Sequence, residues 1–432
     1  MPVVVIDGAS TNPDDYAYEI SGNIYYADPV NGSDANPGTQ SQPFQTIHYA
    51  LSQVSGGDGL LLYGGNYGDV AWGRTGDAAW TQQPIAVVFT DWVTVKAVDG
   101  EDVIFDSLSL GTWNAPGTNT PMPFSTIGNS DLRMRFDGIQ ILDGIEIRGS
   151  RYVDIRNSTV SLAGDIQDRI NDSGISVYNG QHVMLYHNEI THCGVGIQGM
   201  TTDFIVARND IHHNTHDGLS MLGGSNWLVE GNTFRELDDG VDDTVSWGKH
   251  TDGTQLYFVN APDPKWARLA SDFTFRGNVF YHIESMAAML GDSGLGRIER
   301  FTWENNVFGP MNGRMFIMAA DVHDYFIFRN NSVIYAPNDS WTSMWGRTLG
   351  AAGYPLRDRY FNVQIWYGPA ADNPHQANYQ VYNNIFTSAT PSYQEFGLVS
   401  NNLYIDTVNE TMANAEIRTT QPPYTTITGN QR

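Results

Sequence analysis

The sequence predicts an all-β fold in which one short strand-and-turn unit repeats and stacks as a parallel β-solenoid. Three observations support this prediction. An asparagine recurs after a short hydrophobic strand, a glycine-containing strand follows each copy, and long insertions interrupt the pattern without ending it. A unit of 20 to 50 residues cannot bury its hydrophobic face alone, so its copies must stack. The 432 residues do not by themselves settle the number of domains.

The recurring asparagines define the repeat. Copies without a long insertion between them are separated by 21, 23, 28 and 25 residues, which fits one coil of three short strands. An asparagine at one corner of every coil can form hydrogen bonds with its copies above and below, so we expect a ladder. Its predicted members are Asn157, Asn188, Asn209, Asn232, Asn278, Asn306, Asn331 and Asn384.

Two intervals are longer than one plain coil. Asn232 and Asn278 are 46 residues apart, and Asn331 and Asn384 are 53 apart. The first interval contains a single glycine strand, so we interpret it as one coil plus long loops; the second holds either an extra coil or an insertion. Loops inserted between rigid strands often form the binding face of a solenoid.

The N-terminal part contains a helical pattern. Phe44, Ile47, Ala50, Leu51 and Val54 have helical spacing, which predicts a helix at about residues 43–54. A helix there would cover the open end of the solenoid and protect its unpaired edge. The predicted organisation is an N-terminal extension at 1–22, one β-helix domain at 23–400, and a C-terminal tail at 401–432 that packs on the solenoid or caps it.

Composition excludes some partners. The chain has 23 Lys and Arg against 48 Asp and Glu, a net charge of −25, so we expect no nucleic acid and no anionic membrane as partner. The acidic excess indicates either a solvated acidic surface or cation sites that recruit an anionic substrate. One cysteine, Cys193, excludes an internal disulfide. No classical signal peptide is visible at the start of the sequence.

Aligned glycine strands bring two aspartates together. Placing "DGLSML" (217–222) under "DGTQLY" (252–257) stacks Asp217 on Asp252 on successive coils. Two carboxylates one coil apart repel each other unless a cation, a shared proton or a basic side chain intervenes. Each aspartate has a simpler explanation as a turn residue before glycine.

Histidines and other polar residues flank these aspartates. His250 is the first candidate for acid–base catalysis because imidazole titrates near neutral pH, although it also suits a solvated loop. Lys249 and Arg314 are candidates to neutralise a substrate carboxylate. The predicted catalytic residues are His250, Tyr257, Lys249, Asp252, Asp217 and Arg314. The predicted substrate contacts are His216, Gln255, Trp247 and Arg297.

The first insertion is strongly acidic. Asp238, Asp239, Asp242 and Asp243 are closely spaced, which favours calcium, a cation that takes six to eight oxygen ligands, over zinc. The pattern is not an EF-hand because the glutamate expected at its twelfth position is missing. A solvated acidic loop is the alternative.

The segment "ADPVNGSDANPGTQSQPFQTIHYAL" followed by "GGDGLLLYGGNY" (56–67) resembles the entry segment of right-handed parallel β-helix proteins of the pectate lyase-like superfamily. With the repeats, the resemblance covers most of the chain. It implies a right-handed parallel β-helix with an N-terminal capping helix and long loop insertions.

Two enzyme families within that fold share further motifs with the chain. "NTHDGL" followed by an Asp-rich "DDG" resembles the calcium site of family-nine pectate lyases, which implies Asp217 with either Asp238, Asp239 and Asp242 or Asp252 as ligands. That family's lysine base is replaced here by Met289. "ADVHD", with Asp321 and His323, resembles the Asp-Pro-His motif of mannuronan C5-epimerases, but the proline is absent.

Together these features predict an enzyme that acts on an anionic polysaccharide such as alginate or pectate and abstracts the C5 proton of a uronate. Elimination would make it a polysaccharide lyase, and reprotonation an epimerase. The alternatives are a glycoside hydrolase using Asp217 and Asp252, and a non-catalytic phage-tail or adhesin solenoid that binds glycan. We expect an extracellular or virion-associated monomer or homotrimer.

Overall fold

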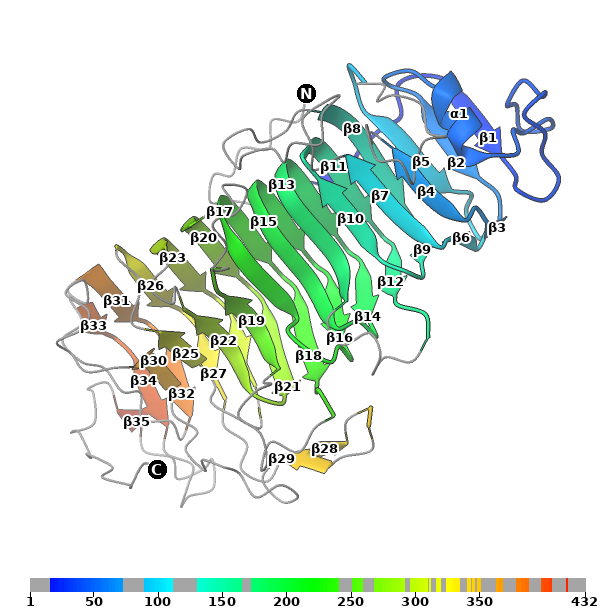
Figure 1. Ribbon diagram of the computed structural model, residues 1–432. Helices are drawn as coiled ribbons and strands as arrows, with labels where there is room; N and C mark the ends of the chain where they lie inside the picture. The colour runs from blue at the N-terminus through cyan, green and yellow to red at the C-terminus, as the bar shows by residue number, and fades with distance from the viewer. Residues whose placement is uncertain are drawn as a thin grey trace.

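The computed structural model describes residues 16–72, 89–111, 130–164, 172–240, 251–258, 268–291, 296–309, 311, 316–319, 324–334, 340–342, 344–345, 348–350, 363–367, 378–387, 398–405 and 417–418. Within these ranges the chain winds as a parallel β-helix, with its coils stacked along one axis (Figure 1). None of the helices in this described part has the length and apolar composition needed to cross a bilayer.

Each coil contributes strands to three walls, called here walls 1, 2 and 3 in the order in which the chain passes through them. In the central coils, walls 1 and 2 are joined by long strands that turn the corner between them. Wall 1 consists of β4 (Asp69–Trp72), β7 (Ser107–Gly111), β10 (Ile145–Arg148), the first parts of β13 (Ser173–Tyr186), β15 (Val195–Ala207) and β17 (Leu219–Glu230), then β19 (Asp252–Leu256), β22 (Met286–Leu290), β25 (Phe316–Ala319) and β30 (Val363–Tyr367).

Wall 2 pairs in the same parallel manner. It consists of β1 (Ile24–Ala27), β2 (Gly59–Leu62), β5 (Val93–Ala97), β8 (Ser130–Asp137), β11 (Ser150–Arg156), the second parts of β13, β15 and β17, β20 (Leu269–Arg276), β23 (Arg297–Glu304), β26 (Phe326–Arg329), β31 (Tyr379–Tyr382) and β33 (Leu398–Ser400).

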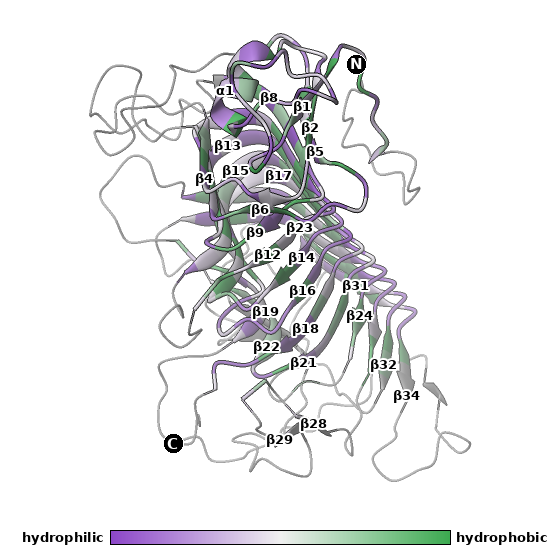
Figure 2. Ribbon diagram, turned by 90° about the vertical axis from the view of Figure 1, so that its right-hand side faces the viewer, coloured by the Kyte–Doolittle hydropathy of each residue, from purple (hydrophilic) through white to green (hydrophobic). Residues whose placement is uncertain are grey.

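Wall 3 is a separate sheet of short strands, and the turned view shows several of them following one another along the axis (Figure 2). It consists of β3 (Gly65–Asn66), β6 (Val103–Phe105), β9 (Gln140–Ile141), β12 (Thr159–Ser161), β14 (Glu189–Thr191), β16 (Asp210–His212), β18 (Thr233–Leu237), β21 (Val279–Ile283), β24 (Val307–Phe308), β27 (Ser332–Val333), β32 (Ile385–Thr387), β34 (Leu403–Ile405) and the antiparallel β35 (Ile417–Arg418). A small hairpin, β28 (Ser340–Thr342) and β29 (Thr348–Gly350), lies outside the walls.

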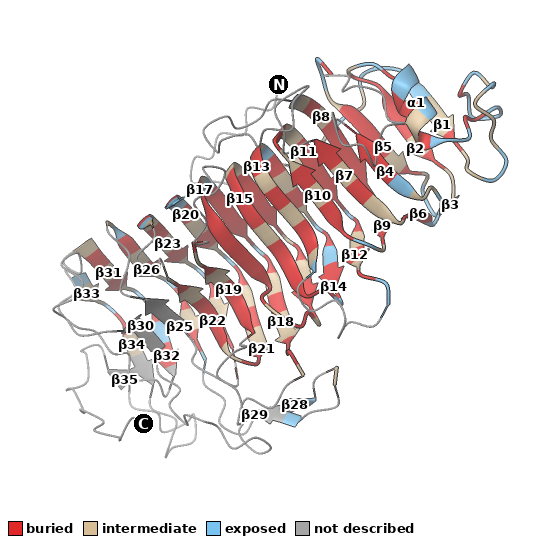
Figure 3. Ribbon diagram, viewed as in Figure 1, coloured by how far each residue is buried: buried red, intermediate tan, exposed pale blue. Residues whose placement is uncertain are grey.

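The side chains that point inward form the core, and much of β13, β15 and β17 is buried (Figure 3). Aromatic residues at the same position of successive coils stack. Trp227, Phe273 and Phe301 follow one another with ring centroids 4.7 Å apart. Burying such rings contributes area-dependent hydrophobic free energy together with a preferred ring geometry. The coil spacing therefore sets the aromatic packing.

The asparagine ladder forms, with one correction. The backbone N–H and the side-chain amide of each ladder asparagine donate to Oδ1 of the next at 2.9 to 3.1 Å, from Asn188 through to Asn402. The prediction for Asn157 was wrong by one residue, because Arg156 pairs with Tyr186 and Ser158 therefore takes the place opposite Asn188. Asn157 instead occupies a left-handed turn position, with φ of 48°. Asn402 is an additional member.

The two long intervals each contain one coil. β19 and β20 complete the coil between Asn232 and Asn278, and β30 and β31 complete the one between Asn331 and Asn384. A helix, α1 (Ile47–Gln53), begins after the N-cap Thr46 and lies beside β1 at one end of the solenoid (Figure 1). It falls within the range expected for a helix; that it caps the solenoid stays a prediction, as do the domain limits.

Candidate functional site

The outward face of wall 1 brings several predicted site residues together. Leu219 pairs with Thr254 and Ser220 with Gln255, which places Asp217 opposite Asp252 on the adjacent coil. The predicted stacking of these two aspartates is therefore confirmed. Both are fully buried, so their charges interact in a medium of lower polarity than water.

Asp217 accepts two hydrogen bonds and forms an ion-pair contact with His216. The Ser220 hydroxyl donates to its Oδ2 at 2.7 Å, and the backbone N–H of Asp252 donates to Oδ1 at 3.2 Å. The Nδ1 atom of His216 lies 3.3 Å from Oδ2, and the His216 side chain remains 29% exposed. A carboxylate fixed in this way can orient a neighbouring imidazole. Asp217 and His216 thus form an oriented pair with a solvent-accessible ring.

A chain of polar side chains continues along wall 1 from this pair. The Tyr178 hydroxyl contacts Gln198 Oε1, and Gln198 Nε2 donates to the Tyr257 hydroxyl at 3.4 Å. Burial and the nearby charge of Asp217 raise the pKa of Tyr257 to about 12. Burial also raises the pKa of Tyr178. Both phenols therefore stay protonated at neutral pH.

Replacing Tyr257 with phenylalanine should change how the free energy of unfolding depends on pH at alkaline pH. Below pH about 10 the phenol is protonated in both the folded and the unfolded chain. Between about 10 and 12 only the unfolded phenol ionises, so the free energy of unfolding falls as pH rises. We expect the Tyr257→Phe variant to lose less stability over this window in urea titrations. An equal loss in both proteins would contradict the raised pKa.

A second group of carboxylates lies at the corner where the first insertion leaves wall 3. Carboxylate oxygens of Asp238, Asp239 and Glu284 all lie within 4.8 Å of one another, and all three side chains are buried. The backbone N–H of Asp239 and the hydroxyl of Thr251 both donate to Glu284 Oε2, at 3.0 and 3.4 Å. Buried oxygen donors at this spacing fit a calcium ion. Thr251 directly precedes Asp252, which connects this group to the wall 1 pair.

The second insertion reaches the same corner. Trp345, between β28 and β29, donates its indole N–H to the backbone carbonyl of Asp238 at 2.9 Å. Its ring lies so close to Gly240 that a Cβ there would meet ring atoms at 2.8 to 2.9 Å. Glycine is therefore required at 240 both for this contact and for a φ of 76°. Two insertions more than 100 residues apart in sequence are packed on one acidic corner.

Of the other predicted residues, the structure describes Gln255 and Arg297. Gln255 lies on wall 1 and contacts Met289 Sδ at 3.5 Å. Arg297 lies instead at the start of β23 on wall 2, where it forms an ion pair with Glu299 at 2.6 Å, so the structure does not bring it to the Asp217 pair. The remaining predicted residues lie outside the described residues: Asp242, Asp243, Trp247, Lys249, His250, Arg314, Asp321 and His323.

Glu284 and Gln198 were not predicted. Glu284 follows the wall 3 strand one coil after Asp238, since Leu237 pairs with Ile283. The segments "RELDD" and "YHIES" carry this equivalence, because in both an acidic residue follows the last apolar residue of a wall 3 strand. Gln198 lies in the glycine-strand register opposite Ser220, but an uncharged glutamine gives no chemical signal in a sequence.

Comparison with known proteins identifies the fold. Residues 125–252 match the family model described as a right handed beta helix region, and no curated protein matches the chain. The match agrees with the three parallel walls, so the expected right-handed parallel β-helix is confirmed.

Solved structures resemble the chain at low identity. A mannuronan C-5 epimerase A-module from Azotobacter vinelandii is 10% identical, with 85% of this chain and 91% of that chain covered and a TM-score of 0.41. A pectate lyase is 12% identical, with 89% and 75% covered and a TM-score of 0.34. A surface adhesin of Streptococcus pneumoniae is 12% identical, with 82% of each chain covered and a TM-score of 0.45. Function must be argued from the side chains of this chain itself.

Proposed function

We propose that this protein is a carbohydrate-active enzyme that removes the C5 proton of a uronate in an acidic polysaccharide, acting as a polysaccharide lyase or a C5-epimerase. The observation that supports this most directly is the oriented His216–Asp217 pair on the same wall as Tyr257, whose phenol is held protonated. A base that takes the C5 proton and an acid that gives a proton are the two roles that this reaction needs.

In the proposed mechanism, the Nδ1–H of His216 is held by Asp217, and the lone pair on Nε2 accepts the proton from C5. The electrons of the C5–H bond pass onto C5 and the adjoining carboxyl group. In a lyase they then form the C4–C5 double bond as the C4–O4 bond breaks, and Tyr257 gives its proton to O4. In an epimerase Tyr257 gives its proton to C5 from the opposite face.

His216 takes the base role in this proposal because its partner and exposure are known. His250 stays a prediction for the same role. The two can be separated with His216→Gln and His250→Gln variants. If His216 is the base, only the first variant should lose activity on a uronate polymer, by about 100-fold or more. Loss in the His250 variant alone would assign the base to His250.

A negatively charged substrate needs a positive charge at the site, because Asp217 and Asp252 would repel it. Asp238, Asp239 and Glu284 would hold calcium, which when bound would neutralise part of the charge of a uronate carboxylate. Lys249 and Arg314 stay predictions for the same task. A polymeric substrate is consistent with an extracellular or virion-associated protein, as monomer or homotrimer.

Calcium bound by Asp238, Asp239 and Glu284 should stabilise the folded protein. A ligand at about 100 times its dissociation constant adds about 2.7 kcal/mol to the free energy of unfolding. We therefore expect calcium to raise the Tm of the chelator-treated protein, and we expect the Asp239→Asn and Glu284→Gln variants to lose that rise. Asp69→Asn, at an exposed aspartate on β4, is the control that should keep it. A rise that survives both corner substitutions would exclude this site.

Glycoside hydrolysis is the second candidate, because Asp217 and Asp252 lie on adjacent coils. Strands in one sheet are about 4.8 Å apart, and carboxyl groups about 5 to 5.5 Å apart are typical of retaining hydrolases. Asp252→Asn should abolish hydrolysis, whereas His216→Gln should leave most of it. The opposite pattern would favour proton abstraction at C5.

The decisive experiment compares products from polymannuronate, polyguluronate, pectate and a neutral glucan, each with calcium and with chelator. Ultraviolet absorbance from an unsaturated uronate end would establish elimination. Altered anomeric NMR signals without that absorbance, together with uptake of solvent deuterium at C5, would establish epimerisation. Reducing ends without unsaturation would indicate hydrolysis. Glycan binding with no product from any polymer would favour the non-catalytic solenoid.

A further inference from the structure

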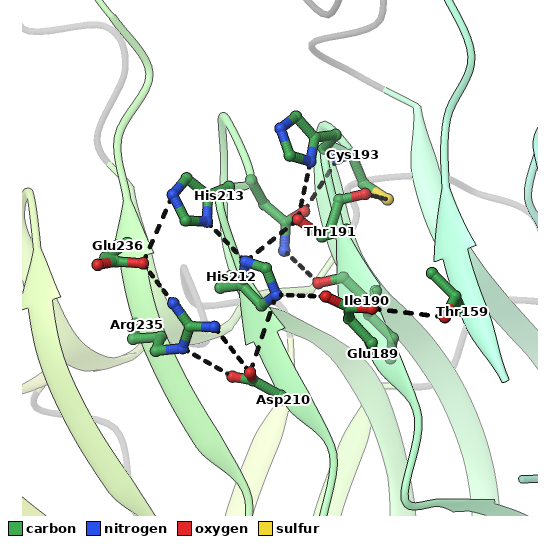
Figure 4. A network of polar contacts seen from close by, with 12 residues as sticks. Thr159, Glu189, Ile190, Thr191, Cys193, Asp210, His212, His213, Arg235 and Glu236 are labelled. Atoms are coloured by element: carbon green, nitrogen blue, oxygen red, sulfur yellow. Dashed lines mark hydrogen bonds and ion pairs between the residues drawn. The ribbon is translucent and has the colours of Figure 1, made fainter. Parts of the chain in front are cut away.

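Three histidines meet where β14 and β16 of wall 3 end: His192 directly follows β14, His212 is the last residue of β16, and His213 follows it. Figure 4 labels His212 and His213 with their partners. The Nδ1 atoms of His212 and His213 lie only 2.6 Å apart. Thr191 Oγ1 lies 3.2 Å from His212 Nδ1 and 2.9 Å from His192 Nδ1. The rings of His192 and His213 stack at 4° with centroids 5.7 Å apart. The Nδ1 atoms of His192 and His212 thus lie at one hydroxyl group, and the Nδ1 atom of His213 lies against that of His212.

The far side of each of the two close rings faces a carboxylate. His212 Nε2 lies 3.2 Å from Glu189 Oε1, and His213 Nε2 lies 3.5 Å from Glu236 Oε2. A carboxylate can only accept, so the tautomer with the hydrogen on Nε2 suits both carboxylates and leaves each Nδ1 with a lone pair. In that tautomer the two lone pairs at 2.6 Å repel each other, whereas a hydrogen on either Nδ1 makes the contact an N–H···N hydrogen bond. A cation between them, either a proton or a metal ion, removes this repulsion.

The two rings have more acidic than basic neighbours. The charged side chains in contact with the two rings or with their partners are Glu189, Asp210, Glu236 and Arg235. Arg235 forms ion pairs with both Asp210 and Glu236, so three negative charges face one positive charge. Burial lowers the pKa of His212 and of His213, and Arg235 lowers that of His212 further. Neutral imidazole is the form that binds metals.

We propose that His212 and His213, joined by His192, bind one first-row transition-metal ion of the zinc class through their Nδ1 atoms. Imidazole nitrogen suits these ions, and the carboxylate–imidazole–metal arrangement is the usual outer shell of such sites. Zinc–nitrogen bonds of about 2.0 to 2.1 Å require the two nitrogens to lie about 3.3 Å apart. Opening the present contact by less than about 1 Å achieves this, and the exposed His192 side chain can turn toward the ion.

This site differs from the group of Asp238, Asp239 and Glu284 in its ligand atoms. Asp238, Asp239 and Glu284 offer only oxygen, which suits calcium, whereas His192, His212 and His213 offer nitrogen. The proposal does not depend on the enzymatic function. Calcium in excess can fill the acidic corner while zinc is tested at the histidines.

The test is isothermal titration of chelator-treated protein with zinc chloride in saturating calcium, followed by cobalt titration read by visible absorbance. We expect one zinc ion per chain and the intense bands of tetrahedral cobalt. The His212→Ala and His213→Ala variants should lose both signals, and Glu189→Gln or Glu236→Gln should weaken binding by about 10- to 100-fold. His187→Ala, at an exposed histidine bonded to Asn157, should bind like the parent protein.

Two results would overturn the proposal. One is the absence of zinc binding in protein whose circular dichroism and Tm are normal. The other is equal binding by the parent and by the His212→Ala/His213→Ala double variant. In the first case histidine NMR would show a single proton shared by the pair and unaffected by zinc. The Glu189→Gln and Glu236→Gln variants keep both histidine rings. They therefore separate a specific loss of zinc binding from a loss caused by misfolding.

Discussion

Replacing Asp217 with asparagine should lower turnover of the true substrate by about 100- to 10,000-fold, the usual range for loss of acid–base catalysis. Asparagine keeps the size of the side chain but no longer stabilises the protonated form of His216, whose Nδ1 lies 3.3 Å from the carboxylate. The measurement is kcat and KM on the polymer identified by the product assay, and kcat should carry most of the loss.

Asp69→Asn is the matched control for Asp217→Asn. Asp69 accepts a hydrogen bond from Ser107 at 2.7 Å, the same distance as the Ser220–Asp217 bond, but on an exposed part of a distant coil. It should keep full activity. If Asp217→Asn folds normally and also keeps full activity, the site on wall 1 is not catalytic.

Replacing Asn278 with alanine should cost about 3 kcal/mol or more of the free energy of unfolding. Oδ1 of Asn278 accepts from the backbone N–H and the amide of Asn232, and its own amide donates to the Val229 carbonyl and to Asn306. The substitution leaves several buried polar groups without partners, each costing about 1 to 3 kcal/mol. Urea denaturation gives the change directly.

Asn305→Gly is the control for the ladder prediction. Asn305 is next to the ladder residue Asn306 but is exposed and has a φ of 57°, which glycine adopts freely. It should change stability by only a few tenths of a kcal/mol. Similar losses in the two variants would mean that the ladder bonds contribute little to stability.

The sequence predicted the repeat well because each coil obeys the same local physics. Asn188 through Asn384 all occupy the ladder, and the glycine strands stack in the predicted register. Asn157 was wrongly predicted as a ladder residue, because asparagine also suits the left-handed turn position one residue before the ladder position. Residue type alone does not distinguish these two roles.

The site was less predictable than the fold. Asp217 and Asp252 could be paired from the glycine-strand register, since both lie at its first position. Glu284 joins Asp238 through wall 3, and Trp345 arrives from an insertion whose path no periodic pattern encodes. Arg297, predicted as a substrate contact, lies on wall 2, and a charged residue at a loop end gives no sign of which wall follows.

The ladder bonds also have a consequence for redesign of the chain. The bond from each asparagine backbone N–H to the next Oδ1 is 2.9 Å whether the two residues are 21 or 53 positions apart. The ladder hydrogen bond between successive coils therefore forms regardless of the length of the loop between them. A foreign segment can be inserted at such a turn for display, provided that the two ends of the segment return one coil apart.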